Sequence, residues 1–132
     1  MRVISGMVLL LAGGSIYLLQ RTTGLLMFRL IDALGLMGCV DSLRASVTTM
    51  PEFFVYNLPG GLWSASYVLL VDALFGSQPM PVRLAWGSLI PLIGLTSELL
   101  QAAGICPGTA DWQDALCYGV PYIVYVLCLT WK

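Results

Sequence analysis

Long uncharged apolar stretches restrict the fold of this sequence more than any other feature. Residues 3–20, between Arg2 and Arg21, carry no charge, and a helix of about 20 mainly apolar residues is long enough to cross a bilayer. The 132 residues include only 6 basic and 7 acidic side chains, whereas about a quarter of the residues of a soluble domain are charged. Because so few charges cannot cover a globule in water, the sequence predicts an integral membrane protein.

Four such stretches predict an all-α fold, an integral membrane four-helix bundle that forms a single membrane domain over residues 1–132. The expected spans cover residues 3–20, 59–75, 82–103 and 114–131. A cleaved signal peptide is the alternative for the first stretch, but its apolar core exceeds the usual ~7–15 residues and no A-x-A-like site precedes Arg21. We therefore expect a retained anchor, and four crossings leave no room for a separate soluble domain.

The connection between the first two spans, residues 24–58, is too long for a turn and too interrupted by charges to cross the membrane. Its first half is amphipathic, since Arg29 and Asp32 lie three residues apart on one helical face while leucine and isoleucine cover the rest. This pattern predicts an amphipathic interfacial segment. The two charges are interpreted either as a solvated ion pair or as part of a lid over a site between the spans.

Composition excludes several classes of function. The chain has no histidine, which removes Ser-His-Asp and Cys-His catalysis and histidine ligation of a metal or haem. A net charge of −1 provides no basic field, so no nucleic acid is expected as a partner. The cysteines are too widely spaced for a Cys-x-x-Cys motif and are expected to be inert, and we expect no cofactor.

Glu98 is an ionisable residue inside an expected span. A charge at the centre of a membrane helix costs about 2.5–3.5 kcal/mol. Such a residue is therefore expected to have a hydrogen-bonding or charged partner, or to belong to a functional site. Gln101 lies three residues further on and shares the helical face of Glu98. A protonated Glu98 could donate to the Gln101 amide, or an ionised Glu98 could meet an arginine from another segment.

Asp111 and Asp114 mark the expected start of the last helix. Asp111 is a suitable N-cap, and Asp114 lies where an acidic group favours the positive end of a helix. Capping accounts well for Asp111 and less well for Asp114, at the edge of a long apolar run. A hairpin of the last two spans would bring Glu98, Gln101 and Asp114 together. There, acidic groups could hold a divalent cation, bind a cationic head group or pass protons.

These residues resemble the signature of the VanZ-like family, small multi-pass bacterial membrane proteins named after a teicoplanin-resistance determinant. The family pattern is Glu-x-x-Gln in one helix, a glycine-containing loop, and Asp-x-x-Asp opening the last helix. Glu98, Gln101, Asp111 and Asp114 match this pattern position by position. The chain departs from the family at two places, with no arginine in the loop before Asp111, and with Tyr118 and Pro121 where asparagine and glycine are common.

The resemblance implies a protein of the bacterial cytoplasmic membrane that lowers binding of a lipoglycopeptide such as teicoplanin to the cell surface, with no established enzymatic activity. Its expected partners are membrane lipids and an envelope lipid or glycopeptide, whose head group Arg29 or Arg44 could contact. We expect both termini in the cytoplasm, although three basic residues lie on each side of the membrane in that orientation.

Two alternatives belong to other classes. The first is a metal-dependent enzyme acting on a lipid phosphate, in which Glu98, Asp111 and Asp114 hold Mg²⁺ and Arg29 or Arg44 contacts the phosphate. The second is a structural partner subunit. Small residues of the first span that permit close helix approach suggest this reading, namely Gly6, Gly13 and Gly14.

Overall fold

The computed structural model describes residues 1–131, which form seven helices and no strand. The helices are α1 (Arg2–Gln20), α2 (Leu26–Ala33), α3 (Met37–Ala45), α4 (Glu52–Tyr56), α5 (Leu58–Phe75), α6 (Met80–Ala102) and α7 (Trp112–Thr130). The predicted all-α class is therefore confirmed for this part of the chain.

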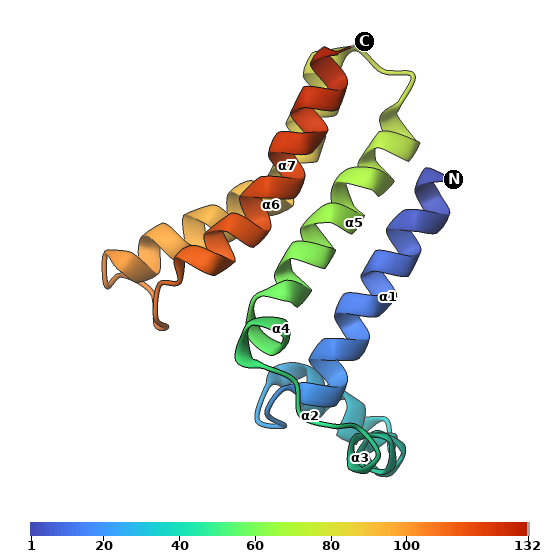
Figure 1. Cartoon of the computed structure of the whole chain (residues 1–132), viewed down its shortest axis with the longest axis vertical. Helices are drawn as coiled ribbons and strands as arrows, with labels where there is room; N and C mark the ends of the chain where they lie inside the picture. Colours follow the sequence, from blue (N-terminus) through green and yellow to red (C-terminus); the bar gives the residue numbers. More distant parts are fainter. Residues whose placement is uncertain (132) are drawn as a thin grey trace.

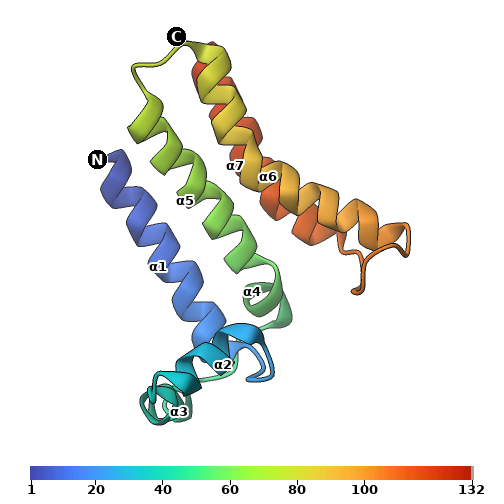
Figure 2. The same ribbon diagram turned by 180° about the vertical axis from the view of Figure 1, so that it is seen from behind.

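The four long helices run alternately up and down, so both ends of the chain lie at the same end of the bundle (Figure 1). Helix α5 is central, because it packs against α1 on one side and against α6 and α7 on the other. Accordingly, 44% of α5 is buried, against 11% of α1 and of α7. Seen from behind, α2 and α3 lie beneath the far end of α1 (Figure 2).

Three helices, α1, α5 and α7, are long and apolar enough to cross a membrane. Large apolar side chains such as Leu11 and Val124 are exposed on their outer faces, where lipid would cover them. These features indicate a membrane protein. The fourth expected span, α6, is the longest helix at 23 residues, but it is not among the three that are apolar enough.

The expected spans agree with the observed helices to within two residues at either end. The largest differences are the starts of the last two helices, expected at 82 and 114 and observed at Met80 and Trp112. The connection over 24–58 contains three short helices instead of one amphipathic segment. The interpretation of Arg29 and Asp32 as an ion pair is wrong, because both ion pairs found within residues 1–131 involve Asp72.

Glycines allow α1 to lie close to α5. A Cβ atom at Gly13 would lie 2.7 Å from Nε1 of Trp63 and 3.2 Å from the carbonyl oxygen of Pro59. At Gly6 the carbonyl oxygen accepts a hydrogen bond of 2.7 Å from the hydroxyl of the buried Ser66. Two of the three glycines that suggested a partner subunit therefore serve packing within the chain, and only Gly14 faces open space.

Gly13→Ala and Gly14→Ala form a matched pair that tests this packing. Alanine favours a helix interior over glycine by about 1 kcal/mol, so Gly14→Ala should be neutral or stabilising. Gly13→Ala should instead destabilise the protein by about 1–3 kcal/mol, because the new methyl group overlaps Trp63. Thermal unfolding of the purified protein in detergent would measure both, and equal melting temperatures would contradict the close approach of α1 to α5.

A buried carboxylate ties the helices together at the end that bears the termini. Asp72 on α5 is 7% exposed and pairs with Arg2 of α1 at 2.6 Å and with Arg83 of α6. The carbonyl oxygen of Arg83 accepts a hydrogen bond of 3.2 Å from the hydroxyl of Tyr125 on α7. All four long helices therefore meet around Asp72, whose negative charge is paired within the protein.

Candidate functional site

The opposite end of the bundle brings together the residues that the sequence singled out. Glu98 and Gln101 lie in the last two turns of α6, and Asp111 and Asp114 lie at the start of α7. A loop of nine residues, 103–111, joins the two helices. Because this loop is short, it places the end of α6 beside the start of α7, as the hairpin prediction required.

Asp111 caps α7 as predicted. Its side-chain Oδ1 accepts a hydrogen bond of 2.9 Å from the backbone N–H of Gln113, which satisfies one of the free donors in the first helical turn. The backbone N–H of Asp111 in turn donates to Oε2 of Glu98 at 2.9 Å. Glu98 therefore meets neither the Gln101 amide nor an arginine, as the sequence had suggested, but a backbone group of the loop.

Asn57 joins this hairpin to the rest of the bundle, and sequence reasoning missed it. The side chain is 3% exposed, and its Nδ2 donates to Oδ2 of Asp111 at 2.8 Å and to Oδ1 of Asp114 at 3.0 Å. Both hydrogens of the amide are thus used. The partner of Asp114, which capping alone did not explain well, is therefore an amide from the junction of α4 and α5.

Gln101 supports the loop and lies outside this hydrogen-bond network. Its amide donates weakly to the hydroxyl of Ser97 at 3.4 Å and packs against Gly108. A Cβ atom on Gly108 would lie 2.9 Å from Cδ of Gln101, and the φ of Gly108 is +131°, a conformation that favours glycine. The glycine of the motif is therefore needed for the loop to close over Gln101.

The hydrogen-bonded carboxylates face a polar pocket of about 400 Å³. Its walls come from the end of α1, from α4 and from the start of α7. The residues that give it its chemistry are Arg21, Glu52, Tyr56, Asn57, Asp111 and Asp114. The pocket therefore combines one basic group with three acidic groups at a single end of the bundle.

Arg21 provides the positive charge of this pocket and is the second residue that sequence reasoning missed. Its guanidinium lies 4.6 Å from the ring centroid of Tyr56 and 5.4 Å from that of Tyr17, positions that favour cation–π attraction. Its Nε is buried and has no hydrogen-bond partner in the described chain. In the sequence Arg21 only ends the first span, so nothing there distinguishes it from a terminal anchor.

The charges of the pocket do not neutralise one another. Within residues 1–131 both ion pairs belong to Asp72, so Arg21, Glu52, Asp111 and Asp114 have no partner of opposite charge within 4.0 Å. Buried or half-buried charges are normally paired. The pocket therefore brings one basic and three acidic side chains together without an ion pair between them.

The arrangement does not support a metal centre. No group of three acidic or cysteine side chains in residues 1–131 is placed to hold one metal ion. The carboxylates are engaged by separate donors, since Glu98 accepts from the backbone N–H of Asp111 while the side chains of Asp111 and Asp114 accept from Asn57. The Mg²⁺ ligand set of the enzyme alternative is therefore not assembled.

Arg29 and Arg44, the arginines expected at a head group, lie outside the polar pocket. Arg44 donates from Nη1 to the carbonyl oxygen of Leu18 at 2.9 Å and lies 5.4 Å from the ring centroid of Phe28, so it fastens α3 to α1 and α2. Arg29 is exposed on α2, beside Asp32. Of the three arginines, only Arg21 faces the predicted carboxylates.

Comparisons with protein-family models, with curated proteins and with solved structures find no match to this chain. The likeness to the VanZ-like family therefore depends on the motif between Glu98 and Asp114, together with the size of the chain and its expected four spans. The pocket geometry is an independent source of information about function, because it does not depend on that likeness.

Proposed function

We propose that this chain is a VanZ-like, four-span protein of the bacterial cytoplasmic membrane whose polar pocket binds the head group of a lipid or glycopeptide in the cell envelope. The observation that carries the proposal is the pocket itself, in which Arg21 and the carboxylates of Asp111 and Asp114 lie together without forming ion pairs. Binding of this kind would lower susceptibility to a lipoglycopeptide such as teicoplanin by competing for, or covering, its envelope target.

The four-span arrangement is supported by the length and position of α6. Its 23 residues extend over roughly 34 Å at 1.5 Å per residue, enough for the ~30 Å hydrocarbon layer. Arg83 and Glu98 lie within the first two and the last two turns of α6, where a charge costs less than at the membrane centre. If α6 crosses, both termini lie on one side, which we assign to the cytoplasm, and the polar pocket lies on the other.

A pocket at that end of the bundle would lie at the depth of lipid head groups. Helices α2 to α4 lie at the same end (Figure 1), and α2 buries Phe28 while it exposes Leu26 and Leu30, as an interfacial helix does. The polar walls would thus meet head groups while the apolar outer faces of the long helices meet acyl chains. This match of depth and polarity supports head-group binding.

The proposal is tested by drug susceptibility in a teicoplanin-susceptible bacterial host. Production of the chain should raise the minimum inhibitory concentration of teicoplanin, and Arg21→Gln and Asp114→Asn should each return it toward the value of the empty host. Asp41→Asn, on the exposed face of α3, is the matched control and should protect like the parent. Each chain must be present in the membrane in equal amount. Protection by both pocket variants at the parental level, or none by the parent, would overturn the proposal.

A further inference from the structure

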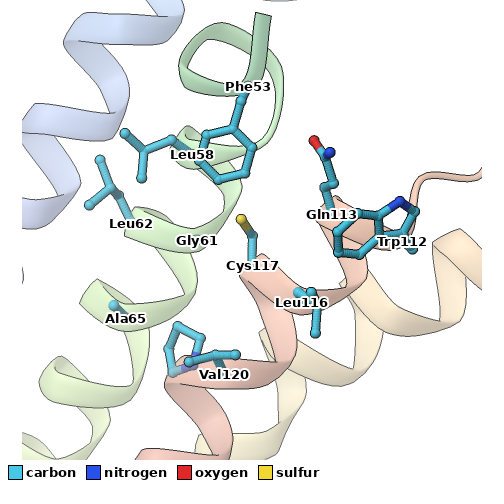
Figure 3. Close-up of a pocket in the computed structure, with 11 residues that line it drawn as sticks. Phe53, Leu58, Gly61, Leu62, Ala65, Trp112, Gln113, Leu116, Cys117 and Val120 are labelled. Atoms are coloured by element: carbon cyan, nitrogen blue, oxygen red, sulfur yellow. The ribbon is translucent and has the colours of Figure 1, made fainter.

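An apolar pocket continues directly from the polar pocket. It measures about 540 Å³ and lies between α4, α5 and α7, with Leu58 and Leu62 on one wall and Leu116 on the other (Figure 3). Phe53 and Gln113 line both this pocket and the polar one. A single molecule could therefore place a polar part in one and an apolar part in the other.

The apolar surface extends further along the same two helices. A second apolar pocket, of about 430 Å³, shares Ala65, Val120 and Pro121 with the first and reaches Asp72. We call the two together the α5–α7 groove. From Leu58 to Asp72 it follows 15 residues of α5, and the 14 steps between them span roughly 21 Å at 1.5 Å per residue. This length exceeds the ~15 Å depth of one leaflet of the hydrocarbon layer.

Small side chains hold the groove open. Gly61 and Ala65 form its floor on α5, and a Cβ atom at Gly61 would lie 3.2 Å from Cβ of Cys117 on α7. Ala65 lines both parts of the groove, so it lies at the point where they join. A larger side chain at Ala65 would therefore divide the groove without touching the polar pocket.

We propose that the polar pocket and the α5–α7 groove together bind one zwitterionic glycerophospholipid whose head group ends in a primary ammonium, as in phosphatidylethanolamine. The lipid phosphate lies at Arg21, the ammonium lies among the carboxylates of Glu52, Asp111 and Asp114, and one acyl chain lies along the groove. This assignment rests on the proposed function, because it requires the pocket to bind a head group.

Charge complementarity selects this class of lipid. The planar guanidinium of Arg21, which lines the polar pocket, suits a phosphate. No basic side chain of residues 1–131 lies within 4.0 Å of these carboxylates, and a primary ammonium brings three N–H donors to them. Phosphatidylcholine brings the cation without these donors, and phosphatidylglycerol brings no cation, so both should bind less well.

The experiment measures lipid retention by native mass spectrometry on the purified, delipidated full chain after incubation with each of the three phospholipids at equal concentration. The parent should retain phosphatidylethanolamine about tenfold better than the other two, the difference expected for charge-assisted hydrogen bonds. Asp114→Asn should remove that preference, whereas Arg21→Gln should lower retention of all three lipids, because all three carry the phosphate. Ala65→Phe should lower retention of all three lipids, and Ala12→Phe, exposed on α1, is its matched control and should change nothing.

The outcomes separate this inference from the proposed function. Equal retention of the three lipids by the parent overturns the assignment of the ligand, and unchanged retention by Ala65→Phe overturns the assignment of the groove. In either case, loss of teicoplanin protection in Arg21→Gln and Asp114→Asn would leave the proposed function standing. Circular dichroism and size-exclusion chromatography of every variant confirm that the comparison is made between folded proteins, and Asp41→Asn provides a second folded control.

Discussion

Replacing Asp72 with alanine should destabilise the protein by about 3–5 kcal/mol, the loss expected when one partner of a buried ion pair is removed. The substitution leaves the guanidinium of Arg83, whose side chain is 13% exposed, without its acidic partner. Arg83 already has a buried Nε with no hydrogen-bond partner in the described chain. Because Asp72 joins α1, α5 and α6, unfolding should remain cooperative but begin at a much lower denaturant concentration.

Arg2→Gln is the matched control for that experiment. Arg2 pairs with the same carboxylate at 2.6 Å, but its side chain is 48% exposed, and exposed pairs contribute about 1 kcal/mol or less. Titration of the protein in mixed micelles with a denaturing detergent, followed by circular dichroism, would measure both variants. An equal loss of stability in the two would show that burial of Arg83 does not govern the energy of this cluster.

The two ends of the bundle differ in whether their charged side chains form ion pairs. Around Asp72, one carboxylate forms ion pairs with two guanidinium groups from two other helices. Around Asn57, two carboxylates share one neutral amide, and the nearby Arg21 interacts with aromatic rings instead of an acid. This contrast is the reason why we assign the Asp72 cluster to helix packing and propose the pocket beside Asn57 as the ligand site.

Features that depend on local sequence were predictable. Uncharged length located the helix that begins at Trp112 within two residues, because the cost of burying charge in a membrane bounds each span. The cap at Asp111 was predictable because it is local in the sequence: the carboxylate accepts a hydrogen bond from a backbone N–H only two residues away. Spacing alone likewise placed Glu98 and Asp114 at one end of a hairpin.

Features that depend on tertiary contact were not predictable. Asn57 and Asp114 are 57 residues apart, and an asparagine before a helix is normally interpreted as a cap. Arg21 acquires its role from Tyr56, which a short helix brings to it. The partner of Glu98 is a backbone N–H, and side-chain patterns contain no information about which backbone donors a loop leaves free.

Asn57→Asp should destabilise the protein by several kcal/mol at neutral pH, of the order of an unpaired buried charge. The substitution keeps the shape of a side chain that is 3% exposed, but it replaces the donor with an acceptor. Three carboxylates would then converge, since the amide nitrogen lies 2.8 Å from Asp111 and 3.0 Å from Asp114. Acidification should reduce the loss, because protonation of one carboxyl restores an O–H donor and removes a like charge.

Asn57→Leu separates the effect of charge from that of hydrogen bonding. It removes the same two hydrogen bonds without adding a charge, so it should cost about 1–3 kcal/mol and show little change between neutral and acidic pH. Unfolding of both variants and the parent in mixed micelles, repeated across that pH range, gives the comparison. If Asn57→Asp were as stable as Asn57→Leu at neutral pH, the carboxylates would not converge on residue 57.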